Sequence, residues 1–254
     1  MKLFKSTREW MNARAELNVN SIGFVPTMGA LHAGHRSLID RCLAENDYSV
    51  VSIFLNPTQF DQAGDLADYP TALKTDLQLL GKAGVEAVLV LETADMYRDG
   101  YTYRVIESGF SRQLCGAQRA GHFDGVLTVV MKLLNLVRPS AAYFGEKDFQ
   151  QLELVRGMVD AFFMDINIVS CPVVREEDGL AMSSRNARLD PHQRELAASL
   201  YAEICRSQTC KQALKRLKKQ GFDVDYVEDY HGRRFAAASL GNTRLIDNVP
   251  ISKT

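Results

Sequence analysis

Short apolar runs alternate with longer amphipathic stretches through most of the chain. The apolar runs have the length of strands, which predicts strands at residues 21–26, 48–56, 85–92, 141–145 and 166–174. Between them, apolar residues spaced three and four apart predict helices near residues 35–45, 73–82, 125–137 and 149–163. Strands that are apolar throughout are typical of a parallel sheet buried on both faces. The pattern therefore predicts an α/β fold with a mostly parallel sheet.

The remaining apolar runs are less regular. Residues 101–106 alternate only in part, which predicts a further and more exposed strand. After Val174 a polar segment is followed by amphipathic helical patterns at 192–206 and 210–221, and then by strand patterns at 224–230 and 243–251. We expect a larger domain over residues 1–174 and a small α+β domain over residues 175–254.

Composition and charge narrow the class of protein. The chain has 254 residues, 46% hydrophobic and 24% charged, with a formal net charge of -1. This balance gives no support to nonspecific binding of nucleic acid or of an anionic membrane surface. The first residues lack the apolar run of a signal peptide, and no run is long enough to span a membrane. The five cysteines include no CxxC pair, which favours reduced thiols in the cytoplasm and disfavours a zinc site.

Five polar or glycine-rich loops follow the predicted strands. They cover residues 26–34, 56–69, 115–123, 145–148 and 175–185. Ligands of open α/β sheets bind outside the carboxyl ends of the strands. We therefore expect these loops to form the ligand site together.

The first loop, PTMGALHAGH, places His32 and His35 where a strand gives way to a helix. The helix start directs free N–H groups and its positive dipole end toward an anion, and two imidazoles on one face can donate hydrogen bonds to phosphate oxygens. The alternatives are a zinc pair or two capping histidines. No acidic third ligand lies nearby in the sequence, so a zinc site is disfavoured.

Two later segments add charge. Lys147 in GEKDFQQ stands at a helix entrance, where the dipole disfavours a cation and an anionic ligand would relieve the conflict. The segment GLAMSSRN carries two hydroxyls beside Arg185, a set able to bind polyphosphate oxygens. Each segment alone has an ordinary alternative, a salt-linked surface lysine or a polar loop. The segments LNPTQF and LCGAQRAGHF are unremarkable when taken singly.

Taken in order, six segments resemble the pantoate–β-alanine ligase family: PTMGALHAGH, LNPTQF, LCGAQRAGHF, YFGEKDFQQ, VREEDGLAMSSRN and TRLIDN. HxGH alone would indicate only the wider group of nucleotidylyltransferases and class I aminoacyl-tRNA synthetases. The resemblance implies an ATP-dependent ligase that makes pantothenate from pantoate and β-alanine, in the pathway to coenzyme A. It implies a Rossmann-like domain with a smaller C-terminal lid, a homodimer, Mg²⁺ bound with ATP, a cytoplasmic location, and neither nucleic acid nor membrane as partner.

The resemblance also assigns residues by position. The implied catalytic groups are His32, His35, Lys147 and Arg185. The implied ATP site comprises Met28, Gly29, Ala30, Leu31, His32, Ala33, Gly34, His35, Gly145, Glu146, Lys147, Asp148, Val174, Met182, Ser183, Ser184 and Arg185. Asn56, Gln59 and Gln151 would bind pantoate, with Gln59 also near β-alanine. No metal site made of protein ligands alone is implied.

The chain departs from the family pattern at several positions. These are Ala33, Arg36, Asp61, Gly64 and Ala120, none of which removes an assigned functional group. The region after Arg185 also reads as shorter than is typical, by some tens of residues near 206–210 and 231–238.

In the implied reaction, the pantoate carboxylate attacks the α-phosphorus of ATP, and β-alanine then displaces AMP from the adenylate. Two other functions remain open on the residues. A nucleotidylyltransferase that stops after transferring AMP would show no dependence on an amine. A nucleotide sensor would bind ATP without turnover.

Overall fold

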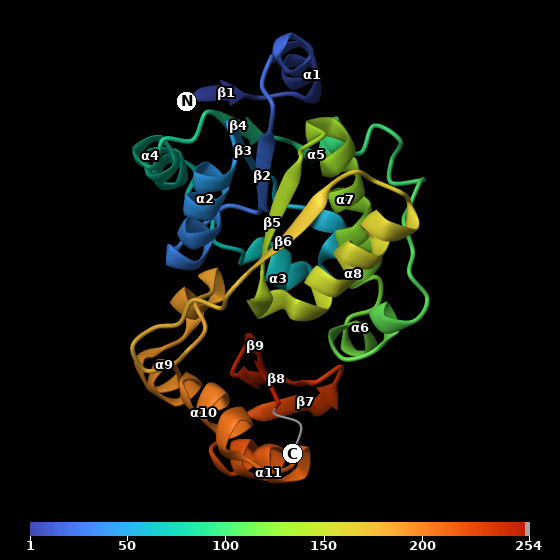
Figure 1. Cartoon of the computed structure of the whole chain (residues 1–254). Coiled ribbons are helices and arrows are strands. Elements are labelled where there is room, and N and C mark those ends of the chain that lie inside the picture. The colour runs from blue at the N-terminus through green and yellow to red at the C-terminus, as the bar shows by residue number, and fades with distance from the viewer. Residues whose placement is uncertain (252–254) are drawn as a thin grey trace.

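The computed structural model describes residues 1–251 and contains two sheets (Figure 1). The larger sheet has six strands in the order β1-β4-β3-β2-β5-β6, and every neighbouring pair is parallel. Its strands are β1 (Lys2–Phe4), β2 (Ile22–Thr27), β3 (Tyr48–Ile53), β4 (Ala87–Val90), β5 (Ala141–Gly145) and β6 (Asn167–Cys171). The predicted α/β fold with a parallel sheet is confirmed.

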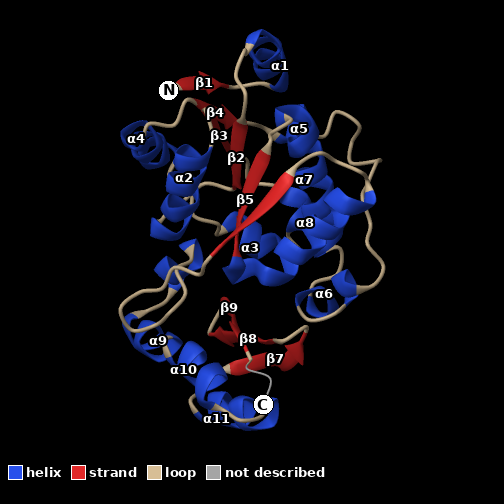
Figure 2. Cartoon of the chain, viewed as in Figure 1, coloured by secondary structure: helices blue, strands red, loops and turns tan. Residues whose placement is uncertain are grey.

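Helices cover both faces of this sheet, as Figure 2 shows. Consecutive strand residues point to opposite faces, so fully buried Phe24 and Val25 enter two different cores. One face packs against α2 (Ala33–Glu45) and α4 (Leu73–Ala83). The other face packs against helices α1 (Thr7–Glu16), α5 (Thr93–Met96), α7 (His122–Val137) and α8 (Phe149–Ala161). This two-sided burial is the reason for the unbroken apolar runs in the sequence.

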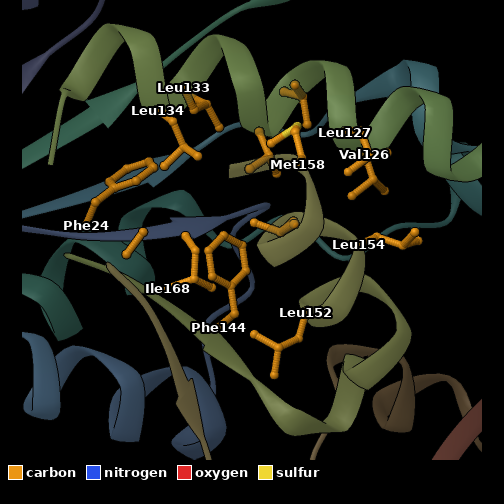
Figure 3. Close-up of a cluster of buried hydrophobic side chains, with 14 of the residues drawn as sticks. Phe24, Val126, Leu127, Leu133, Leu134, Phe144, Leu152, Leu154, Met158 and Ile168 are labelled. Carbon is orange, nitrogen blue, oxygen red and sulfur yellow. The ribbon is translucent and has the colours of Figure 1, made fainter. Parts of the chain in front are cut away.

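The core between the sheet and helices α7 and α8 contains large side chains (Figure 3). Phe24 of β2 and Phe144 of β5 lie opposite Leu127 and Leu134 of α7, and Leu152 comes from α8. Each of these side chains is at most 5% exposed. Burial of one such side chain contributes about 1.5–3 kcal/mol, so the core fixes the position of the strand ends that carry the loops.

The second sheet is antiparallel and belongs to the C-terminal part of the chain. It has the order β7-β8-β9, with β7 (Asp223–Tyr230), β8 (Arg233–Leu240) and β9 (Thr243–Pro250). Helices α9 (Pro191–Ala197), α10 (Ser199–Arg206) and α11 (Cys210–Lys219) precede it, and its outer face packs against Leu200, Ile204 and Leu217. Its inner face joins the main core through Tyr226, Phe235 and Ala237.

Some elements differ from the prediction. Residues 101–106 form no strand: Tyr103 and Ile106 are exposed, and the Val105 N–H donates to the side chain of Thr128 rather than to a sheet. The helix predicted over 192–206 is divided at Ala198 into α9 and α10. Helix α7 begins at His122, three residues before its predicted start at 125. The sequence pattern missed β1, α1 and β8.

The connections between the longer helices and strands contain short helical turns. These are η1 (Pro57–Gln59), α3 (Ala63–Ala67), η2 (Phe110–Arg112), α6 (Cys115–Gln118), η3 (Glu146–Asp148) and η4 (Ser184–Arg188). Such turns are too short for apolar periodicity to reveal them. Within residues 1–251, no helix is both long and apolar enough to cross a membrane.

Candidate active site

A cleft of about 910 Å³ lies at the carboxyl ends of the parallel strands. The strand order reverses between β2 and β5, since β2 leads on to β3 on one side while β5 leads on to β6 on the other. The loops after β2 and β5 therefore diverge and leave room between them, which is the usual ligand position in open α/β sheets. Strand β9 of the second sheet lines the same cleft.

The structure brings most of the predicted site residues to this cleft. Its lining includes Met28, His32, Gly34, His35, Asn56, Gln59, Gly145, Lys147, Asp148, Gln151, Val174, Met182, Ser183, Ser184 and Arg185. Gly29, Ala30, Leu31, Ala33 and Glu146 are not among the lining residues. All except Ala30 are adjacent in sequence to one that is.

His32 and His35 cap helix α2. His32 is the N-cap residue, and its Nδ1 accepts from the Gly34 N–H at 3.1 Å, while His35 Nδ1 accepts from the His32 N–H at 3.4 Å. A side chain at position 34 would place its Cβ 2.9 Å from the His32 ring, which explains the glycine between them. In a neutral imidazole whose Nδ1 accepts, Nε2 carries the proton. Capping thus leaves both Nε2–H groups as donors, so the capping and phosphate interpretations are compatible.

Both histidines favour the neutral form. Burial lowers the pKa of His35 to about 3, and the neighbouring His32 adds to the shift. Burial also lowers the pKa of His32, with Lys147 contributing. At neutral pH these residues can therefore offer N–H dipoles, while the positive charge comes from Lys147 and Arg185.

A buried carboxylate fixes the turn that carries these histidines. Asp76 on α4 is 2% exposed, and its two oxygens accept from the N–H groups of Ala30 at 2.9 Å and Leu31 at 2.8 Å. The turn requires left-handed backbone at Gly29 and Ala30, with φ of 87° and 50°. Asp76 also stands in the first turn of α4, where the helix dipole stabilises a negative charge. Asp76 could not be identified from the sequence, because a single Asp near a helix start is typical of an exposed capping residue.

Asn56 holds the side chain of Gln59. Asn56 is 1% exposed, its Nδ2 donates to Gln59 Oε1 at 2.9 Å, and its Oδ1 accepts from the Tyr97 hydroxyl at 2.7 Å. Because the Tyr97 hydroxyl occupies the Asn56 oxygen, the Asn56 NH₂ group faces Gln59 and orients its amide. Gln151 stands in the first turn of α8 and also lines the cleft.

His122 and Arg119 hold the backbone of Gln59. His122 Nδ1 donates to the Gln59 carbonyl at 2.7 Å, so its Nε2 accepts from Arg119 at 3.1 Å, and Arg119 also pairs with Asp61 at 2.8 Å. Burial lowers the pKa of His122 to about 3, and the Arg119 charge adds to the shift. The segment LCGAQRAGHF is thus a support for LNPTQF, a role that neither segment reveals alone.

The segment with Ser183, Ser184 and Arg185 is bound to α3. Ser183 caps η4, the Ser184 hydroxyl donates to the Tyr69 hydroxyl at 3.2 Å, and Arg185 pairs with Asp65 at 2.8 Å. Burial alone would raise the pKa of Asp65, but its bonds to Arg185 and Arg188 outweigh burial and lower it. Asp65 therefore holds two arginines at the cleft wall.

The cleft suits an anion more than a metal ion bound by protein alone. Lys147 stands in η3 between β5 and α8, and Arg119, Arg185, Arg188 and Arg244 also line the cleft. Among residues 1–251, no three His, Cys, Asp or Glu side chains are grouped so that they could hold a metal ion. Cationic side chains around a helix start are a typical environment for phosphate groups.

Comparison with known proteins agrees with this geometry. A family model described as pantoate-beta-alanine ligase matches residues 1–250. A pantothenate synthetase of Bdellovibrio bacteriovorus is 55% identical over 231 residues, which cover 91% of this chain and 92% of the relative. Another, of Legionella pneumophila, is 49% identical over 249 residues, covering 98% and 99%.

Two solved structures share the whole fold. The chain is similar to a pantoate-beta-alanine ligase from Francisella tularensis, solved in complex with beta-gamma ATP and beta-alanine: the TM-score is 0.94, the identity 38%, and the coverage 98% of this chain and 97% of that one. A pantothenate synthetase from Thermus thermophilus gives a TM-score of 0.90 at 38% identity, with both chains fully covered. The chain as a whole is thus about as long as these relatives.

Loss of the Asp76 carboxylate should affect both stability and ATP binding. Asp76→Asn replaces one acceptor by an NH₂ group that faces a backbone N–H, so we expect the free energy of unfolding to fall by about 1–3 kcal/mol. ATP binding should weaken, because the turn carrying His32 loses its support. Urea unfolding and calorimetric titration measure the two effects. Asp160→Asn, at an exposed position, is the control; wild-type ATP affinity in Asp76→Asn would contradict this role.

The buried imidazole of His122 should make the stability of the chain depend on pH. Its pKa is about 3 in the folded chain, against the 6.5 of an ordinary histidine. Between these values only the unfolded chain takes up the proton, so stability falls as pH drops from 6.5, by up to about 1.4 kcal/mol per pH unit. His122→Asn keeps a donor for the Gln59 carbonyl but cannot ionise. We expect its stability to fall less between pH 7 and pH 4.5.

Urea unfolding at several pH values in this range measures the slope. His192→Asn, at an exposed histidine on α9, is the matched control and should retain the wild-type slope. Parallel slopes for His122→Asn and wild type would show that His122 does not carry this acid sensitivity.

Proposed function

The chain belongs to the pantoate–β-alanine ligase family, and we propose that it joins pantoate to β-alanine at the cleft through a pantoyl-adenylate intermediate. Its activity is that of an ATP-dependent ligase of pantothenate biosynthesis. The observation that carries the proposal is the convergence of the HxGH turn, Lys147 and Arg185 on one cleft beside two glutamine side chains, Gln59 and Gln151.

In the first step, a carboxylate oxygen of pantoate attacks the α-phosphorus of ATP, the bond to the β-phosphate oxygen breaks, and pyrophosphate leaves. Negative charge grows on the phosphate oxygens. Donors fixed in advance around that charge lower the barrier most effectively. We assign this task to the Nε2–H groups of His32 and His35 and to the charges of Lys147 and Arg185.

In the second step, the amine of β-alanine attacks the acyl carbon, AMP leaves with the bonding electrons, and the amine loses a proton. The adenylate must be kept from water until the amine arrives. The β7–β9 sheet lies over the cleft and packs against the main core through Tyr226 and Phe235, an arrangement that supports this protection.

The remaining assignments rest on the family resemblance and on the position of these residues in the cleft. Val174 would contact the adenine, and Met182 would belong to the ATP site. Gly145 and Asp148 would lie near the ribose, and Ser183 and Ser184 at the phosphates. Gly29, Ala30, Leu31, Ala33 and Glu146 do not line the cleft, so we propose that they contribute through the backbone conformation of their segments. Gln59 and Gln151 would bind pantoate, with Gln59 near β-alanine and Asn56 orienting Gln59.

Mg²⁺, the assembly and the location are further parts of the proposal. Since the described residues form no three-ligand metal cluster, Mg²⁺ would be held by the phosphates of ATP and would neutralise their charge. Lys147 and Arg185 would then act beside it. The family resemblance supports a homodimer in the cytoplasm, and exposed Tyr103 and Ile106 offer apolar surface for a second copy.

The products test the proposal. With all three substrates, we expect AMP and pyrophosphate in equal amounts, with one amide formed per AMP. Omission of each substrate in turn separates the alternatives, because a nucleotidylyltransferase would not need β-alanine and a sensor would form no AMP. ADP and inorganic phosphate as the first products would contradict the proposal, since they require attack at the γ-phosphorus.

His35 should act mainly on the adenylation step. We expect His35→Ala to slow adenylate formation by roughly 10²–10³-fold, the effect of losing one fixed donor to a developing oxyanion. ATP affinity should change much less. Single-turnover kinetics with radiolabelled ATP measure the step, and a wild-type rate in the variant would leave His35 only its capping role.

The amides of Gln59 and Gln151 should tolerate truncation better than a negative charge. Alanine removes hydrogen bonds that contribute about 0.5–1.5 kcal/mol each, and it leaves room for water. Glutamate keeps the shape but brings a like charge toward the pantoate carboxylate, which costs several kcal/mol. We therefore expect Gln59→Glu and Gln151→Glu to impair pantoate-dependent adenylation more than the alanine variants do.

All four variants should bind ATP normally in the absence of pantoate, which is the internal control. The assay is run at a pH where the new glutamate is ionised. If the glutamate variants match or exceed the alanine variants, these amides do not face the pantoate carboxylate.

A further inference from the structure

Strand β9 of the second sheet carries Asp247 and Asn248, two polar residues that are 3% and 2% exposed. They belong to the TRLIDN segment, for which the proposed mechanism has no role. Each makes hydrogen bonds to a different segment of the phosphate site. We propose that this pair is a two-sided anchor that sets the positions of Lys147 and Arg185 relative to each other, an inference that rests on the proposed ATP site.

Asn248 binds the turn that carries Lys147. Its Nδ2 donates to the carbonyls of Glu146 at 2.8 Å and Lys147 at 3.0 Å, and its Oδ1 accepts from Arg233 Nε at 2.6 Å. The arginine can only donate and the carbonyls can only accept, so these partners fix the orientation of the amide. The η3 turn is therefore held from the second sheet as well as from β5.

Asp247 binds the other segment. Its two oxygens accept from Arg175 at 2.6 Å and 2.9 Å, and Arg175 also donates to the Gly179 carbonyl at 3.0 Å. Arg175 forms a backbone bridge with Ala181, shortly before Ser183 and Arg185, and its guanidinium stacks over the Tyr201 ring at 3.6 Å. Asp247 also accepts from the Asn248 N–H at 2.7 Å, which joins the two halves of the anchor.

The geometry assigns positioning roles to both residues. Neighbours on one strand have a fixed separation, so two segments bound to them cannot drift apart independently. A group held in advance at the place where charge develops is worth more than a mobile one. The anchor thus presets the gap that the ATP phosphates must fill.

A double-mutant cycle on ATP affinity tests the Asn248 half. Asn248→Leu keeps the approximate shape and adds no charge, and we expect it to weaken ATP binding roughly 5- to 50-fold, the scale of one or two lost hydrogen bonds. If Asn248 acts through Lys147, the same change in a Lys147→Ala background should weaken binding less than 2-fold, as roughly expected of fully coupled sites. Asn248→Ala, which admits water to the carbonyls, is a second and milder variant if the leucine variant folds poorly.

Asp247→Asn tests the Asp247 half of the anchor, because the two explanations predict opposite changes in ATP affinity. Removing a negative charge from the cleft would strengthen ATP binding if charge alone mattered, whereas loss of the anchor would weaken it. We expect weaker binding, by roughly 3- to 10-fold, and a smaller effect in an Arg185→Ala background. Tighter binding in Asp247→Asn would overturn the anchor.

Val249→Ala is the matched control for stability. Val249 follows Asn248 on β9 and packs into the core beneath α10 and α11, away from the phosphate site. It should lower the melting temperature but leave ATP affinity unchanged. Calorimetric titration with ATP on all variants gives the result without turnover. If the Asn248 and Lys147 effects add, the anchor is wrong; if Lys147→Ala itself binds ATP normally, the proposed ATP site fails first and the inference falls with it.

Discussion

The reversal of strand order between β2 and β5 is the constraint on which the site depends. A parallel sheet buried on both faces has no room for a ligand except at the ends of its strands. Only where neighbouring connections turn in opposite directions do the loops separate enough to admit one. The HxGH turn follows β2 and the Lys147 turn follows β5, so the two halves of the phosphate site are set apart by the sheet itself.

The cationic side chains and the HxGH turn of the cleft are held by carboxylates whose oxygens are already bound by protein groups. Asp76 holds the HxGH turn by its backbone, Asp65 holds two arginines, and Asp247 holds Arg175. A site for an anion thus contains three carboxylates, and the oxygens of each are occupied by hydrogen bonds or ion pairs. A carboxylate satisfied in this way orders a cationic site, whereas a free one facing the phosphates would repel them.

The sequence predicted the strands that are buried on both faces, because their unbroken apolar runs have one simple explanation. It failed at β8, whose Ala236, Ala237 and Ala238 favour helices by intrinsic propensity and form a strand only because packing on both sides leaves room for small side chains. The candidate site was assembled from ordered motifs. The motifs could not reveal contacts between distant segments, because these contacts form only in the folded chain. Examples are the hydrogen bond from the Ala30 N–H to Asp76 and the one from His122 to the Gln59 carbonyl.

The position of β8 between two cores has a consequence for how the molecule can move. Its alternate residues belong to different clusters, Phe235 and Ala237 to the main core and Ala236 and Ala238 to the core beneath α10 and α11. Swinging the C-terminal sheet outward as a rigid body would bring Phe235 and Tyr226 into water, at about 25 cal/mol for each Å² of apolar surface. Passage of substrates and products is therefore cheaper through small displacements of surface segments than through separation of the two sheets, and the two cores should melt as one cooperative unit.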